Sequence, residues 1–142
     1  MRYHVLSSTK YIVMHNKGEQ MNKFQQQLKK GVLEMLVLKI ISEEQSYGYK
    51  MRAEIKLRSK GALLLDDGTM YPILYRLEQE EAIASTWVLG EESEEREKPQ
   101  KGVKPKKMYT ITSIGQARLE RQMECWQEFS NIIETFLREG LK

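Results

Sequence analysis

The C-terminal residues of this chain carry two neighbouring, mostly apolar stripes. One stripe consists of Leu119, Met123, Trp126, Ser130, Ile133 and Leu137, and the other of Cys125, Phe129, Ile132 and Phe136. Because these residues recur every three or four positions, they predict one long helix of coiled-coil period from Ser113 to about Glu139. Ser113 and Gln116 have the form of a capping box at its start. A terminal helix with so wide an apolar face needs another chain to cover it.

The simplest partner for this face is a second copy of the chain. The residues expected at the resulting dimer interface are Leu119, Trp126, Phe129, Ile133, Phe136 and Leu137.

Two further helices are predicted ahead of residue 60. Between Asn22 and Ser42 the apolar positions continue almost all round the helix, which therefore needs cover on more than one side. Ser46 is the expected N-cap of a second helix from Tyr47 to about Ser59. The polar side of this second helix is basic and carries Lys50, Arg52, Lys56 and Arg58.

A third helix is expected to begin near Thr69. The short polar side chains of residues 66–69 can accept the free N–H groups of a helix start, and Pro72 is expected within the first turn. The helix should end near Glu81. Its core face consists of Ile73, Leu74 and Leu77. Its outer face carries Tyr71, Tyr75 and Arg76, and its acidic residues, Asp66, Asp67, Glu78, Glu80 and Glu81, are expected on the far side from any nucleic acid.

Two strands joined by a charged loop follow the third helix. Residues 83–89 and 107–112 have the β-branched and aromatic content of strands. Between them, five glutamates from Glu91 to Glu97 precede five lysines from Lys98 to Lys107. This hairpin is typical of a wing.

Composition excludes several classes of protein. The chain has 142 residues and a net charge of +3, so one main domain is expected and the balance is only mildly basic. Its one cysteine, Cys125, fits a reducing, cytoplasmic setting and is interpreted as a buried, inert thiol. Both histidines, His4 and His15, precede the patterned sequence. We therefore expect no catalytic residue, metal or cofactor, and we predict that the chain is not an enzyme. No apolar run reaches the roughly 18 residues of a membrane helix.

The order of elements predicts a mainly α fold with a small two-stranded β wing. Residues 22–112 would form a winged helix-turn-helix DNA-binding domain, and residues 113–142 a long C-terminal dimerisation helix. Residues 1–21 are an N-terminal extension that is either disordered, an ordered arm, or sequence ahead of the true translation start. In a winged helix the third helix enters the major groove and the wing reaches the flanking backbone.

Four sequence strings carry a specific resemblance. These are YGY at 47–49, GTMYPILYRLE at 68–78, IASTW at 83–87 and KPKKMYTITSIG at 104–115. Together they resemble the PadR family of bacterial transcriptional regulators, over roughly residues 28–137. Met108 stands where the family commonly has an aromatic residue, and the loop at 90–103 is longer than usual. Both departures lie in the wing and leave the rest of the resemblance unchanged.

The resemblance implies a homodimeric, sequence-specific regulator that binds double-stranded operator DNA, most simply as a repressor. The residues it implies for DNA contact are Tyr47, Tyr49, Lys50, Thr69, Met70, Tyr71, Tyr75, Arg76, Lys104, Lys106 and Lys107. The alternative interpretation is that the tyrosines pack, Arg76 pairs with a nearby glutamate and the lysines are simply solvated. A winged-helix adaptor that binds proteins instead of DNA is the alternative function.

Trp126 has two interpretations. An aromatic residue on an apolar stripe usually packs in a core or interface. Drug-sensing members of the family, which this helix resembles, use such a tryptophan from each chain to sandwich a flat aromatic ligand. That resemblance implies a small aromatic effector bound near Trp126, Met123 and Ser130.

Overall fold

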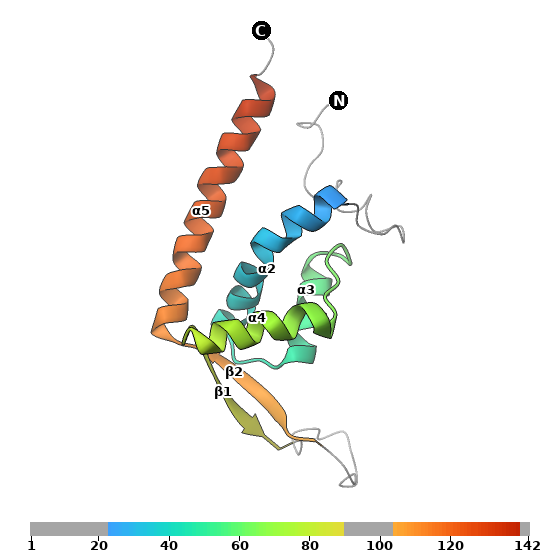
Figure 1. Ribbon diagram of the computed structural model, residues 1–142, viewed down its shortest axis with the longest axis vertical. Helices are drawn as coiled ribbons and strands as arrows, with labels where there is room; N and C mark the ends of the chain where they lie inside the picture. The colour runs from blue at the N-terminus through green and yellow to red at the C-terminus, as the bar shows by residue number, and fades with distance from the viewer. Residues whose placement is uncertain (1–22, 90–103, 140–142) are drawn as a thin grey trace.

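Four helices and a two-stranded hairpin make up the part of the chain that the structure describes. This computed structural model describes residues 23–89 and 104–139 (Figure 1). Its elements are, in order, α2 (Lys23–Glu43), α3 (Gly48–Arg58), α4 (Asp67–Gln79), β1 (Ile83–Val88), β2 (Lys106–Ile111) and α5 (Ser113–Arg138). The predicted mainly α fold with a two-stranded wing is confirmed. The expectations for residues 1–21 and for the loop at 90–103 lie outside the described residues.

The core lies where the second half of α2 meets the other elements. Its largest fully buried side chains include Val37, Leu38, Ile41, Met51, Met70, Leu74, Leu77 and Ile83. Helix α2 contacts α3, β2 and α5, so its apolar circumference is covered on several sides, as its sequence required. The first turns of α2 differ, because Phe24 and Leu28 remain 64% and 55% exposed.

Ser46 does not cap α3. The helix begins at Gly48, and the capping position is occupied by Tyr47, whose side chain makes no capping hydrogen bond. Ser46 instead exchanges two backbone hydrogen bonds with Tyr109 of β2, with N–O distances of 3.1 and 2.7 Å. The predicted cap was wrong because the backbone of Ser46 pairs with the edge of the sheet. This pairing buries the Ser46 hydroxyl away from the N–H groups of the helix.

Helix α4 starts two residues earlier than predicted. Asp66 is its N-cap, and the carboxylate accepts a hydrogen bond from the Thr69 N–H at 2.9 Å. Pro72 therefore lies in the second turn of the helix and not in the first. Because proline has no N–H, it cannot donate a hydrogen bond to the carbonyl of Gly68 at this position.

The two strands pair antiparallel, from Ile83 opposite Ile111 to Val88 opposite Lys106. The chain then turns directly into α5, whose N-cap is Thr112 and not the predicted Ser113. The Thr112 hydroxyl accepts from the Gly115 N–H at 3.0 Å and donates to the Ala82 carbonyl at 3.0 Å. The second of these bonds ties the start of α5 to the chain just ahead of β1, a tertiary contact that a capping-box pattern does not show.

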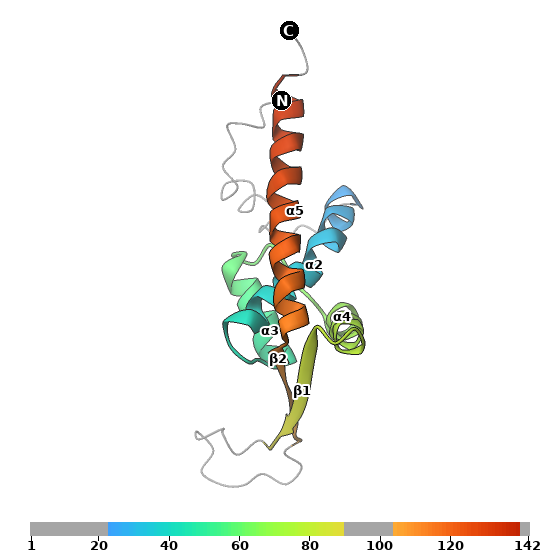
Figure 2. The same ribbon diagram turned by 90° about the vertical axis from the view of Figure 1, so that its left-hand side faces the viewer.

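Helix α5 leaves the rest of the molecule after its first turns (Figures 1 and 2). Gly115 and Leu119 are its buried residues among those described. Leu119 is 2% exposed and belongs to the core of its own chain, so its prediction as a dimer contact was wrong. Cys125 was expected to be buried, but it is exposed in the single chain. Within the described ranges, no helix is both long enough and apolar enough to cross a membrane.

Candidate nucleic-acid interface

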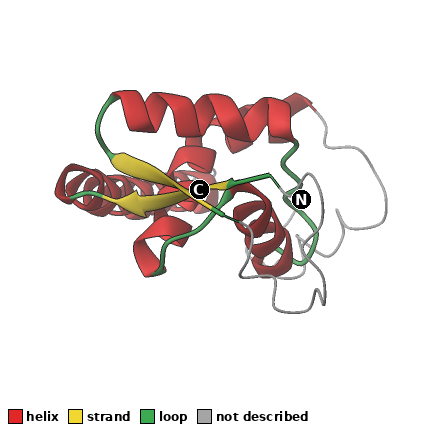
Figure 3. Cartoon of the chain, turned by 90° about the horizontal axis from the view of Figure 1, so that it is seen from below, coloured by secondary structure: helices red, strands yellow, loops and turns green. Residues whose placement is uncertain are grey.

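One surface hollow joins α3, α4 and the hairpin. It has a volume of about 670 Å³. Its lining residues are Tyr47, Gly48, Tyr49, Tyr71, Tyr75, Glu78, Trp87, Pro105, Lys106, Lys107 and Tyr109. Seen from below, the two strands cross the middle of the view, and one helix runs beside them along the upper edge (Figure 3). The arrangement brings most of the predicted DNA-binding residues from three separate segments onto one face.

Helix α4 presents two tyrosines to this hollow. Tyr71 and Tyr75 are 46% and 68% exposed and lie one turn apart, so both side chains stand on the same side of the helix. Thr69 is half-buried ahead of them. Met70 is fully buried in the core, so its prediction as a DNA contact was wrong.

Gly48 sets how closely α3 approaches α4. A Cβ atom at this position would lie 2.7 Å from the hydroxyl oxygen of Tyr71. The glycine of the sequence string at 47–49 therefore lets Tyr71 lie across the start of α3.

Arg76 lies on another side of α4 from the tyrosines. Its Nη2 atom donates to Oε1 of Glu34, on α2, at 2.8 Å. The structure thus favours the alternative in which Arg76 pairs with a glutamate. Arg76 does not line the hollow to which Tyr71 and Tyr75 belong.

The hairpin brings lysines to the hollow. The ammonium group of Lys106 stands 4.3 Å from the centre of the Tyr47 ring, a cation–π distance. Lys107 Nζ is 5.8 Å from the centre of the Trp87 ring and 3.2 Å from Oε1 of Glu78. Lys104, the first described residue ahead of β2, is exposed. The face is therefore cationic along the hairpin and hydroxyl-bearing along α4.

Glu78 was expected on the far side of α4 from the predicted DNA contacts, but it lines the same hollow as Tyr71 and Tyr75. Its Oε2 atom accepts a hydrogen bond from the Ser85 hydroxyl at 2.5 Å. This hydrogen bond, and then the interaction with Lys107, hold the pKa of Glu78 below its ordinary value. The spacing of Tyr71, Tyr75 and Glu78 is that of one helix face, so the sequence carried this signal.

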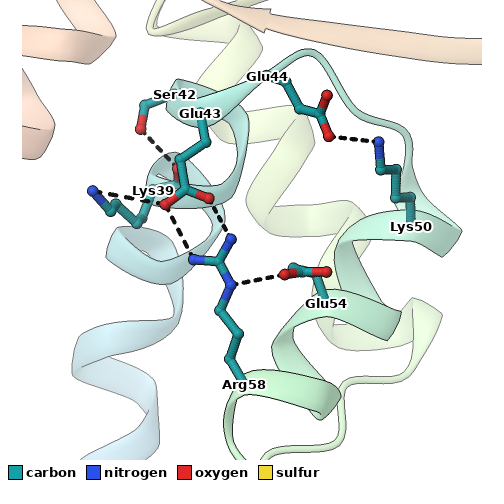
Figure 4. A network of polar contacts seen from close by, with 7 residues as sticks. All are labelled: Lys39, Ser42, Glu43, Glu44, Lys50, Glu54 and Arg58. Carbon is teal, nitrogen blue, oxygen red and sulfur yellow. Dashed lines mark hydrogen bonds and ion pairs between the residues drawn. The ribbon is translucent and has the colours of Figure 1, made fainter.

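The basic side of α3 is largely taken up by acidic neighbours (Figure 4). Lys50 Nζ lies 2.8 Å from Oε1 of Glu44, and the guanidinium of Arg58 pairs with Glu43 and Glu54. The hydrogen bond to Glu44 raises the pKa of Lys50. Lys50 would have to leave Glu44 in order to contact DNA.

Tyr49 extends the face along α3. It is 68% exposed, and the guanidinium carbon of Arg52 lies 5.8 Å from its ring centre. Arg52 in turn pairs with Asp67 at 2.9 Å, which joins α3 to the start of α4.

A second hollow, of about 750 Å³, lies between α2, α4 and α5 beside Trp126. Its lining residues are Gly31, Val32, Glu34, Met35, Arg76, Glu80, Arg118, Arg121, Gln122, Cys125, Trp126 and Phe129. Met123 and Ser130, predicted beside Trp126, are not in this set, and the Ser130 hydroxyl donates to the Gln127 carbonyl at 3.1 Å.

Glu34 is the centre of the polar contacts in this second hollow. Burial alone would raise its pKa, but hydrogen bonds from Arg76 and Gln122, and the charges of Arg76 and Arg118, lower it overall. Glu34 stays ionised and holds α4 and α5 to α2. Within the described residues no group of three His, Cys, Asp or Glu side chains is placed to hold a metal ion.

The comparisons with known proteins agree with this arrangement. The model of the transcriptional regulator PadR-like family matches residues 37–121, more than half of the chain. A protein from Lysinibacillus sphaericus, described only as uncharacterized, is 34% identical over 113 residues, which cover 80% of this chain and 94% of the relative.

Solved structures show the same fold. A PadR-like transcriptional regulator from Bacillus cereus is 31% identical and superposes with a TM-score of 0.61, covering 78% of this chain and 96% of its own. A PadR family regulator from Eggerthella lenta is 26% identical with a TM-score of 0.64, over 80% of this chain and 88% of its own. The chain therefore belongs to the PadR-like family of transcriptional regulators.

Proposed function

We propose that this regulator binds double-stranded operator DNA as a homodimer and acts as a repressor. The observation that carries the proposal is the single face on which Tyr71 and Tyr75 of α4 meet Lys106 and Lys107 of the hairpin. Hydroxyl groups suit both base edges and phosphates, and lysines suit phosphates. With α4 in the major groove, the hairpin would lie against the adjacent backbone.

The uncovered face of α5 supports the homodimer. Its large side chains, Trp126, Phe129, Ile133, Phe136 and Leu137, are 40% to 74% exposed in the single chain. An apolar strip of this length on a helix of 26 residues is typical of an interface and unusual for a surface in water. Two copies packed through α5 would present two α4 helices related by a two-fold axis, which fits a symmetric operator.

The wing lysines provide the direct test of DNA binding. Replacing Lys104, Lys106 and Lys107 together by alanine should weaken binding to all DNA. The slope of log K against log salt should become shallower by about two to three units, one for each lost phosphate contact that releases a counterion. Mobility-shift titrations at several salt concentrations measure this slope.

The matched control replaces Lys23, Lys29 and Lys30 by alanine. These lysines stand at the start of α2, away from the hairpin (Figure 1), so the slope should stay as in the parent. An unchanged slope in the wing variant would show that the hairpin does not touch DNA, and complete absence of DNA binding by the parent would favour the adaptor function.

The second part of the proposal is release by a small aromatic effector bound at Trp126. This tryptophan is 49% exposed and lines the hollow between α2, α4 and α5. A flat ligand there would gain stacking and apolar burial against Trp126, while the polar side chains of Glu34, Arg76 and Gln122 already bond one another, which suggests micromolar affinity.

Fluorescence can test the effector site, because the chain has only two tryptophans. In a Trp87→Phe background the emission comes from Trp126 alone, and planar aromatic dyes, drugs or phenolic acids should quench it. Trp126→Ala in the parent should abolish binding measured by calorimetry and leave the dimer and its DNA affinity nearly intact. If Trp126→Ala instead dissociates the dimer, and the parent binds none of these compounds, Trp126 is a packing residue.

A further inference from the structure

Glu78 is the only acidic residue among the described residues that line the candidate DNA-binding hollow. One carboxylate oxygen accepts from the Ser85 hydroxyl at 2.5 Å, and the other lies 3.2 Å from Lys107 Nζ. The side chains of Lys107 and Glu78 are 37% and 30% exposed, so the ion pair stands at the rim of the hollow and is only partly screened by water. A carboxylate in this place is unfavourable for a surface that must approach phosphates.

We propose that Glu78 is a positioning residue that holds Lys107 in the hollow and competes with the DNA backbone for it. The inference rests on the proposed DNA-binding function. Lys107 would have to exchange Glu78 for a phosphate when DNA binds, and Glu78, still bonded to Ser85, would be left beside the backbone. Glu78 would in this way limit the affinity of the regulator for DNA of any sequence.

The two hairpin lysines should consequently differ in their contribution to the salt dependence. A lysine that neutralises a phosphate releases about one condensed counterion. Lys106 stands over the uncharged ring of Tyr47, so its contact with a phosphate should give this full release. Lys107 is already neutralised by Glu78 in the free protein, and the exposed carboxylate would take up a cation when Lys107 leaves. The net release from Lys107 should therefore be close to zero.

Removal of the Glu78 charge should free Lys107. Glu78→Gln keeps an oxygen that accepts from Ser85 and has nearly the same shape, so the thermal unfolding midpoint should change little. The affinity for a random-sequence duplex should rise severalfold, and the slope of log K against log salt should steepen by about one unit. If Glu78 only supported the fold, its replacement by glutamine would not steepen this slope.

The matched control is Glu80→Gln. Glu80 belongs to the same stretch of chain, but its partner is Arg118 of α5, at 2.6 Å, and it lines the other hollow. The control should leave the slope and the affinity for random DNA as in the parent.

The test is a double-mutant cycle read by salt-dependent titration of one random-sequence duplex. We expect Lys106→Met to reduce the slope by about one unit in the parent, Lys107→Met to change it little in the parent, and Lys107→Met to reduce it by about one unit in the Glu78→Gln background. If Lys107→Met reduces the slope of log K against log salt by a full unit in the parent, the proposal is overturned, and this result does not depend on whether Glu78→Gln folds. A folded Glu78→Gln variant with the same slope as the parent would also overturn it. If the parent binds no DNA at low salt, the proposed function itself fails, which is a different result from a binding parent without this asymmetry.

Discussion

Replacing Gly115 by alanine is expected to destabilise the fold by roughly 3 kcal/mol. A Cβ atom on Gly115 would lie 2.0 Å from the carbonyl oxygen of Ala82 and 2.8 Å from Cγ1 of Ile111. The carbonyl cannot easily move aside, because it also accepts hydrogen bonds from the backbone N–H and the hydroxyl of Thr112. The start of α5 would have to shift away from the hairpin. Denaturant unfolding followed by circular dichroism measures the change.

Gly31→Ala is the matched control for this prediction. Gly31 lies within α2, and a Cβ atom there would have no neighbour within 4 Å. This variant should gain up to about 1 kcal/mol from the higher helix propensity of alanine. Equal stability of the Gly115→Ala variant and the parent would show that α5 does not begin against Ala82.

Replacing Ile133 by aspartate should abolish the dimer and with it operator binding. Ile133 lies at the middle of the uncovered face of α5 and is 40% exposed in the single chain. An unpaired carboxylate buried there in each of two chains should reduce the free energy of dimerisation by several kcal/mol. Sedimentation velocity should give a monomer, and mobility-shift titration should show loss of operator binding.

The control for Ile133→Asp introduces the same charge two residues earlier. Asn131 is exposed and lies on the opposite side of α5, so Asn131→Asp should remain dimeric. An Ile133→Asp variant that sediments as an intact dimer would show that copies of the chain associate through another surface.

The sequence predicted the fold well because its strongest signals are local. Helical spacing, strand composition and the four strings with family resemblance were each contained in a short stretch of chain. The caps were less predictable. Ser46 and Ser113 were both suitable cap residues, but Tyr109 engages the backbone of Ser46, and Ala82 positions Thr112 to cap α5 instead. Contacts between residues so far apart in the sequence decide such details.

The candidate site was predicted in part for the same reason. Tyr71 and Tyr75 fall outside the apolar face of α4, so helical spacing places them outward. Met70 lies four residues before Leu74, and this spacing could have indicated that it is buried. The partner of Arg76 is Glu34, on another helix, and nothing in the neighbourhood of Arg76 in the sequence indicates this pair.

The central claim is that two copies of the chain bind a two-fold symmetric DNA site through α4 and the hairpin. Selection of duplexes from a random pool by the full chain, followed by sedimentation of the complex with the enriched duplex, tests it most directly. We expect enrichment of an inverted repeat whose half-sites are centred about one helical turn apart or a multiple of it, bound by two chains. Failure to enrich any sequence, or a complex of one chain on a site without symmetry, would contradict the claim.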